Sequence, residues 1–117
     1  MKTIACAGLL LFLSTAVFAD LNTPVFAENH AAVALKHADV AVFEGRAGHG
    51  PTLVEQAKVA LEHTLAASLV AKSIQKSHLD AAAKELQESI DEGNLGHTDI
   101  ATKHAAKAVA HIEAGNK

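Results

Sequence analysis

Sulfur is nearly absent from this sequence of 117 residues, which contains one cysteine, Cys6, and one methionine, Met1. Both lie within residues 1–19, which have the features of a cleavable export signal. Removal of that signal is expected to leave a chain with no disulfide bond, no thiolate and no thioether. A metal site in the remaining protein would therefore have to use nitrogen and oxygen atoms.

The export signal is predicted from three features of residues 1–19. Lys2 supplies a positive start, residues 4–13 form an apolar stretch too short to span a bilayer stably, and Val17-Phe18-Ala19 is a small-residue cleavage pattern. Cleavage is expected before Asp20, with Val25-Phe26-Ala27 as a weaker second site. The predicted mature protein, residues 20–117, is periplasmic and has no membrane segment.

Large aromatic residues are also scarce, since tryptophan and tyrosine are missing. The abundance of alanine and the lack of bulky rings favour thin, closely packed helices over a thick β-sandwich. Residues 20–117 are enough for one domain with one core. We therefore expect a single helical domain.

Several function classes lack their sequence signatures. The formal net charge is −3 at pH 7, and no basic stripe with interleaved aromatic residues indicates nucleic-acid binding. The sequence has no H-E-x-x-H motif, no nucleophile elbow, no phosphate-binding glycine loop and no C-x-x-C-H haem motif. An enzyme is therefore not expected. One noncovalent haem is disfavoured because the histidines are too many and too evenly spread.

Helix signals recur along the chain, whereas strand signals are nearly absent. Short loops favour antiparallel neighbours, so the predicted fold class is all-α, an up-and-down antiparallel four-helix bundle. Thr52 and Ser77 are N-cap candidates, with Glu55 and Asp80 three residues on. The expected helices are Pro24 to Glu44 before Gly45, Thr52 to a point between Ala67 and Gln75, Ser77 to Glu92 before Gly93, and Thr98 to Gly115.

All eight histidines lie on ladders of positions seven residues apart, which an α-helix places on nearly the same face. Glutamate or glutamine occupies the other positions of the same ladders. A single histidine on a helix surface is more often solvated than a ligand, so it is the whole set of ladder residues that indicates a metal-binding surface. The candidate metal ligands are His30, His37, His49, His63, His78, His97, His104 and His111, with Glu44, Glu85 and Glu92, and Gln56 is the remaining ladder residue.

An apolar row follows each ladder by one residue, about 100° around the helix. The ladders are therefore expected to flank the core, at the mouth of the groove between helices. The expected core rows are Leu35, Ala38 and Val42; Val54, Ala57 and Leu61; Leu79, Ala83, Leu86 and Ile90; and Ala105, Val109 and Ile112.

Small residues stand four positions after ladder residues. They are expected to leave room for an imidazole ring to lean toward a neighbouring helix. These residues are Ala34, Ala41, Ala60, Ala67, Ala82, Ser89, Ala101 and Ala108.

Ladder neighbours on one helix are about 10 Å apart, whereas metal–nitrogen bonds are about 2 Å long. Shared sites must therefore join different helices, or else each histidine binds weakly alone. Pairing the first helix with the fourth, and the second with the third, gives three levels along the bundle. The expected pairs are His30 with His111 and His63 with His78, then His37 with His104 and Gln56 with Glu85, and finally Glu44 with His97 and His49 with Glu92.

The sequence resembles the small periplasmic metal-binding protein family of nitrifying and related bacteria. The similarity is closest at Lys36-His37-Ala38, Glu62-His63, residues 93–97 and residues 101–105. It implies a four-helix bundle with heptad-spaced histidines that binds several divalent or trivalent metals, copper above all, and a link to copper tolerance. The chain departs from this pattern where Glu44, Gln56, Glu85 and Glu92 replace imidazole, which favours mixed nitrogen and oxygen coordination.

The predicted function is periplasmic buffering of divalent transition metals. Imidazole and carboxylate without sulfur favour Cu(II), with Ni(II) and Zn(II) weaker. Protonation of imidazole competes with the metal, so binding should weaken below about pH 6. A monomer with metal ions as its partners is expected. The alternative is a small helical interaction or chaperone-like protein whose histidines respond to acid.

Overall fold

The computed structural model describes residues 29–117. The predicted export signal, both cleavage sites and the predicted helix start at Pro24 lie outside the described residues. Within residues 29–117 the structure has four α-helices and no strand. The helices are α1 (His30–Arg46), α2 (Gly50–Val70), α3 (Ser73–Asn94) and α4 (Thr98–Gly115).

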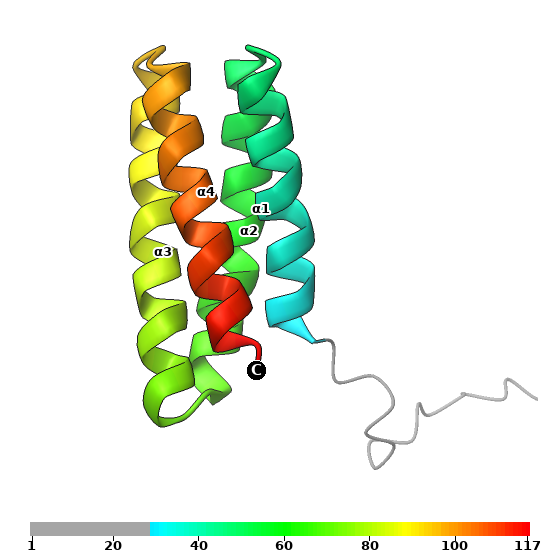
Figure 1. Ribbon diagram of the computed structural model, residues 1–117, viewed down its shortest axis with the longest axis vertical. Coiled ribbons are helices and arrows are strands. Elements are labelled where there is room, and N and C mark those ends of the chain that lie inside the picture. The colour runs from blue at the N-terminus through cyan, green and yellow to red at the C-terminus, as the bar shows by residue number, and fades with distance from the viewer. Residues whose placement is uncertain (1–28) are drawn as a thin grey trace, which may run out of the picture.

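The four helices form an up-and-down antiparallel bundle, which confirms the predicted fold class (Figure 1). The α1/α2 and α3/α4 hairpins have their turns at the same end of the bundle, and the α2–α3 connection lies at the opposite end. Each helix packs against two neighbours, because α2 contacts α3 and α1 contacts α4 in addition to the contacts within each hairpin. None of the described helices is long and apolar enough to cross a membrane.

The core consists largely of alanine, with a few larger aliphatic side chains between the helices. Leu53, Leu79, Leu86 and Ile112 are the large aliphatic side chains that are fully buried. The expected apolar rows are confirmed, since Leu35, Leu61 and Val109 are partly buried against the core and the other row members are buried. Among the described residues, no buried side-chain nitrogen or oxygen lacks a hydrogen-bond partner.

The small residues four positions after the ladder also belong to the core. All eight are buried, and seven of them have no exposed surface. The expectation that they leave room for imidazole rings is therefore wrong. These positions lie about 40° from the ladder, between it and the apolar row, where the neighbouring helix fills the space.

The two hairpin turns have the same backbone form. The His49 N–H donates to the Glu44 carbonyl at 2.9 Å, and the His97 N–H donates to the Glu92 carbonyl at 2.9 Å. The second glycine of each turn is left-handed, with φ of 80° and 81° at Gly48 and Gly96. Glycine adopts this conformation without the steric penalty that a Cβ imposes.

The helix stops predicted at Gly45 and Gly93 are wrong, because α1 and α3 continue to Arg46 and Asn94. Both glycines are instead places where the two hairpins approach closely. A Cβ added to Gly45 would lie 2.0 Å from Thr102 Oγ1, and one added to Gly93 would lie 2.4 Å from Val54 Cγ2. In each turn, the first glycine therefore allows the two hairpins to pack closely, and the second glycine adopts the left-handed conformation that the turn requires.

The predicted caps at Thr52 and Ser77 are also wrong, because both residues lie inside helices. His49 and Lys72 hold the N-cap positions of α2 and α3 without a side-chain capping hydrogen bond. The glycine turns and the short α2–α3 connection start these helices earlier than the side-chain signals suggested. The predicted ends of the second and fourth helices are confirmed at Val70 and Gly115.

The other two helix starts are set just before their first residues. Asn29 caps α1, since its Oδ1 accepts from the Ala32 N–H at 3.1 Å, and the helix begins at His30. Thr98 begins α4 and is not its cap, because His97 takes the N-cap position.

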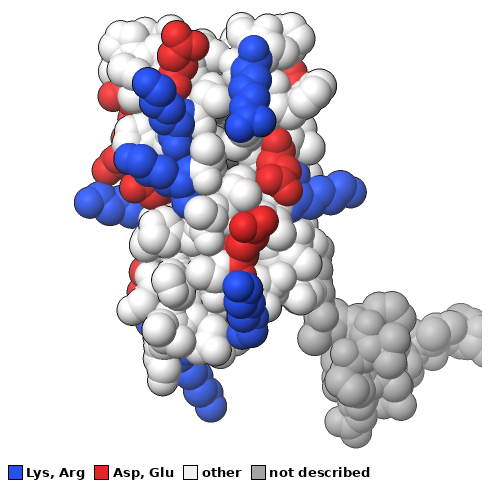
Figure 2. Space-filling view, in the orientation of Figure 1, with Lys and Arg blue, Asp and Glu red and all other residues white. Residues whose placement is uncertain are grey.

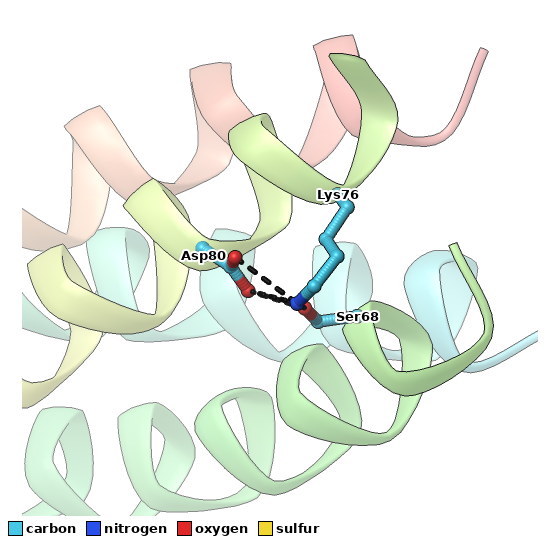
Figure 3. Close-up of polar contacts among 3 residues, drawn as sticks. All are labelled: Ser68, Lys76 and Asp80. Atoms are coloured by element: carbon cyan, nitrogen blue, oxygen red, sulfur yellow. Dashed lines mark hydrogen bonds and ion pairs between the residues drawn. The ribbon is translucent and has the colours of Figure 1, made fainter. Parts of the chain in front are cut away.

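A polar network joins α2 to α3 beside their connection (Figure 3). Ser68 Oγ donates to Asp80, and Lys76 Nζ lies 3.1 Å from both Asp80 carboxylate oxygens and 3.0 Å from Ser68 Oγ. The hydrogen bond from Ser68 and the interactions with Lys76 lower the pKa of Asp80 below its ordinary value of 3.8. The network therefore favours the ionised carboxylate in the folded state.

Asp80→Asn is expected to destabilise the bundle at neutral pH. Because folding lowers the pKa of Asp80, the ionised carboxylate stabilises the folded state at pH values above its unfolded pKa of 3.8. This stabilisation is lost as the pH falls through the lower pKa of the folded state. Urea midpoints of the wild type and Asp80→Asn, followed by circular dichroism, should therefore differ at pH 7 and converge as the pH falls below the lowered folded pKa of Asp80. Asp39→Asn, at an exposed aspartate of α1, is the control. A gap that persists unchanged at low pH would contradict this assignment.

Gly93→Ala is expected to clash with Val54, at a cost of about 1–3 kcal/mol that the better helix propensity of alanine partly offsets. Only Val54 Cγ2 lies closer than 3.6 Å to the added Cβ. Val54→Ala should therefore destabilise the Gly93→Ala protein less than it destabilises the wild type, by about 0.5–3 kcal/mol. Denaturant unfolding of the four proteins measures this coupling, and strict additivity would count against the contact.

Candidate functional site

The ladder residues of α1 and α2 meet along the seam between these two helices, here called the α1/α2 seam. Near the α2–α3 connection, His30 Nδ1 lies 3.0 Å from His63 Nδ1. In the middle, His37 Nδ1 lies 2.8 Å from Gln56 Oε1. At the hairpin turn, His49 Nδ1 lies 2.7 Å from Glu44 Oε2. Every ladder residue of this hairpin therefore contacts a ladder residue across the seam or turn.

The ladder residues of α3 and α4 meet in the same way along the α3/α4 seam. The rings of His78 and His111 have centroids 5.9 Å apart. In the middle, His104 Nδ1 lies 2.7 Å from Glu85 Oε2. At the turn, His97 Nδ1 lies 2.7 Å from Glu92 Oε2. The second hairpin therefore repeats the pairing scheme of the first.

The two seams correspond to each other at a constant separation of 48 residues. His30, His37 and Glu44 of the first hairpin correspond to His78, Glu85 and Glu92 of the second, and His49, Gln56 and His63 correspond to His97, His104 and His111. The turn sequence E-G-x-x-G-H occurs in both hairpins. The repeating unit is therefore the helical hairpin, and the two copies differ at the middle level of the ladder.

The predicted levels along the bundle are confirmed, but the predicted partners are wrong. Four histidines lie at the end near the α2–α3 connection, as expected. His30 contacts His63 and His78 contacts His111, so these pairs join the two helices of each hairpin. The ladder of α1 lies on the side of the helix that faces α2, so its side chains reach that neighbour.

The α1/α2 seam also holds a cluster of three imidazoles. The His63 ring lies 5.2 Å from the His30 ring and 6.3 Å from the His37 ring, measured between centroids, and the second pair is stacked. All three side chains are half-buried. This part of the first hairpin offers nitrogen donors to an ion.

The turn histidines are oriented by carboxylates. Because a carboxylate accepts, the contacts to Glu44 and Glu92 hold a proton on Nδ1 of His49 and His97 and leave Nε2 with its lone pair for a metal ion. The side chains of His49 and His97 are 63% and 55% exposed, so an ion reaches Nε2 directly from solvent. Each turn therefore presents one oriented imidazole beside one carboxylate.

The middle of the α3/α4 seam brings three potential ligands together. His104 Nδ1 lies 3.2 Å from Glu88 Oε2 in addition to its contact with Glu85. Within residues 29–117, Glu85, Glu88 and His104 are the one set of three or more His, Cys, Asp or Glu side chains with donor atoms all within 4.8 Å of one another. Glu88 is not among the predicted ligands because it lies off the seven-residue ladder, although its position three residues after Glu85 places it on the same face of α3.

The charged side chains on one face of the bundle do not form a surface of one sign. Figure 2 shows lysine, arginine, aspartate and glutamate interspersed over one face of the bundle. This face has no basic stripe of the kind that would attract a nucleic-acid backbone.

The family model described as small metal-binding protein matches residues 1–115. A comparison with curated proteins found no match. The family description agrees with the chemistry of both seams, where imidazole nitrogens and carboxylate oxygens lie at hydrogen-bonding distance from one another.

The contacts within hairpins predict which histidines act together. His30→Ala and His63→Ala should each weaken the same binding event by at least about tenfold, and the double variant should lose no more than either single variant. His30→Ala combined with His111→Ala should instead remove two events, one from each seam. Zn(II) titration calorimetry measures both combinations. If the losses of Zn(II) binding add equally in His30→Ala/His63→Ala and in His30→Ala/His111→Ala, each histidine binds metal independently.

Proposed function

The chain belongs to the small metal-binding protein family, and from this premise we propose that it binds and buffers divalent transition-metal ions, chiefly Cu(II), along its two hairpin seams. The observation that carries the proposal is the arrangement of all eight histidines at the seams and turns of the hairpins. Each of these histidines either contacts the imidazole ring of another ladder histidine or has its Nδ1 within hydrogen-bonding distance of a side-chain oxygen.

Cu(II) is proposed as the main cargo because the donor set is rich in imidazole and contains no sulfur in the described residues. Imidazole nitrogen suits Cu(II), Ni(II) and Zn(II), and Cu(II) binds most strongly at a given set of nitrogen and oxygen donors. The cluster of His30, His37 and His63 is the richest nitrogen source and is therefore the favoured first Cu(II) site. Ni(II) and Zn(II) are expected to bind more weakly.

Buffering is proposed over catalysis or transfer by one tight site. The ligands are spread over three levels of two seams, and their side chains are half-buried or exposed. Such a surface takes up several ions in succession and releases them as the free concentration falls. This behaviour would support copper tolerance.

A periplasmic location is proposed from the signal features of residues 1–19, whose placement lies outside the described residues. A protein that scavenges copper before the ion enters the cytoplasm would need this location. Mass determination of the chain recovered from a periplasmic extract tests the proposal, and an uncleaved chain confined to the cytoplasm would refute it.

Copper titration followed by electron paramagnetic resonance tests the function directly. The untagged wild-type protein should bind Cu(II) with nitrogen hyperfine couplings at the first additions. The triple variant His30→Ala/His37→Ala/His63→Ala should bind the first Cu(II) at least about tenfold more weakly, because the cluster is removed. Glu62→Ala, at the exposed neighbour of His63, is the matched control. Copper bound through oxygen alone in the wild type would rule out imidazole ligation.

The alternative function, a small helical interaction or chaperone-like protein, has one observation in its favour. Leu69, Val70 and Ile74 are 84%, 78% and 66% exposed at the end of α2 and the start of α3. A partner that covers this apolar end would not need the seams. Retention of the untagged protein on a copper-loaded or nickel-loaded resin distinguishes metal buffering from protein interaction. Metal buffering requires retention, whereas the interaction function does not.

A further inference from the structure

The middle level of the ladder has different chemistry in the two hairpins. The α3/α4 seam has Glu85, Glu88 and His104 at this level. The positions 48 residues earlier in the α1/α2 seam are His37, Val40 and Gln56. The first hairpin therefore has one imidazole and a neutral amide where the second has one imidazole and two carboxylates.

The three donor atoms of the second hairpin are spaced as ligands of a single ion. His104 Nδ1 lies 2.7 Å from Glu85 Oε2 and 3.2 Å from Glu88 Oε2. An ion that binds adjacent ligands at about 2.1 Å with right angles between the bonds holds the donor atoms about 3.0 Å apart. A cation would replace the proton that Nδ1 shares with the two carboxylates, so little movement of the side chains is needed to bring all three donor atoms onto it.

The local charge also favours a cation. Glu85 and Glu88 are three residues apart on one face of α3, where like charges destabilise a helix. Within residues 29–117, both glutamates form their ion pairs with the single imidazole of His104. The side chains of Glu85 and His104 are only 20% and 19% exposed, so water screens the carboxylates incompletely. A divalent cation would offset both charges at once.

We propose that Glu85, Glu88 and His104 form a chelating site for oxygen-preferring divalent cations, of which Mn(II) is the diagnostic member. Carboxylates and water suit Mn(II), whereas imidazole clusters suit Cu(II), Ni(II) and Zn(II). Cu(II) still binds any nitrogen and oxygen site more tightly than Mn(II) does. Mn(II) affinity therefore distinguishes the two hairpins. The second hairpin binds Mn(II) at these three residues, whereas the imidazole cluster of the first hairpin binds Mn(II) poorly.

This proposal rests on the proposed metal-binding function and adds the cation class and the ligands of one site. Its experiment uses Mn(II) alone with the full chain. Free Mn(II) gives a sharp multi-line electron paramagnetic resonance spectrum that is lost on binding, so the titration counts the bound ions directly. The wild type should show one class of Mn(II) site that is stronger than the binding to the rest of the surface.

Glu88→Gln is the decisive variant, because Glu88 is 41% exposed and its replacement by an amide of the same shape leaves the core untouched. It should weaken Mn(II) binding at least about tenfold, since one of three protein ligands is lost. His104→Ala should have an effect at least as large. Glu113→Gln removes the same charge from an exposed position of α4 and should leave Mn(II) binding as in the wild type.

Failure of this proposal is distinguishable from failure of the proposed function. Mn(II) binding that is absent from the wild type, or that Glu88→Gln and Glu113→Gln reduce equally, would overturn the three-ligand site. Cu(II) titration of the same wild-type sample tests the proposed function separately. A protein that binds Cu(II) through nitrogen but shows no Glu88-dependent Mn(II) site would keep the function and lose the inference.

Discussion

The arrangement of both seams depends on the close approach of helices that have alanine at their core positions. Helix axes lie about 8–10 Å apart depending on the side chains at the contact, and small side chains favour the lower part of that range. Ala34, Ala41, Ala60 and Ala108 have no exposed surface, so the neighbouring helix covers the position beside each ladder residue. Glutamate and histidine side chains are then long enough to meet across a seam at 2.7 Å. Leucine at these positions would separate the helices and break the contacts between ladder residues.

The sequence was sufficient to predict the fold class, the core rows and the level of each ladder residue along the bundle. Periodicity gives these directly, because a residue number fixes both the height and the angle of a side chain on its helix. It was not sufficient to predict the partners of His30 and His78. In an up-and-down bundle each helix has two neighbours, and which one lies on the ladder side depends on whether the four helices are arranged clockwise or anticlockwise. The heptad pattern is the same for both arrangements, so pairing α1 with α4 was as consistent with the sequence as pairing α1 with α2.

The ends of α1 and α3 could not be predicted for a different reason. Two glycines in each turn compete for the role of helix stop, and local rules favour the first one. At Gly93 the deciding factor is Val54 on another helix, because no Cβ fits between them. A contact between two helices, such as that of Gly93 with Val54, cannot be inferred from the sequence of the turn alone. The same limit explains Glu88, whose importance follows from the position of His104 on the neighbouring helix.

The separation between core and seam allows the ligands to change without changing the fold. None of the residues of the main buried cluster is a histidine or a glutamate, and the ladder side chains of the helices are half-buried beside it. A substitution at a seam therefore alters the donor atoms at little cost in core packing, since cavities and clashes arise mainly at buried positions. The two hairpins illustrate this freedom: they keep the same E-G-x-x-G-H turns, yet His37 and Gln56 in one correspond to Glu85 and His104 in the other. A duplicated hairpin of this type diversifies its cation preference one seam residue at a time.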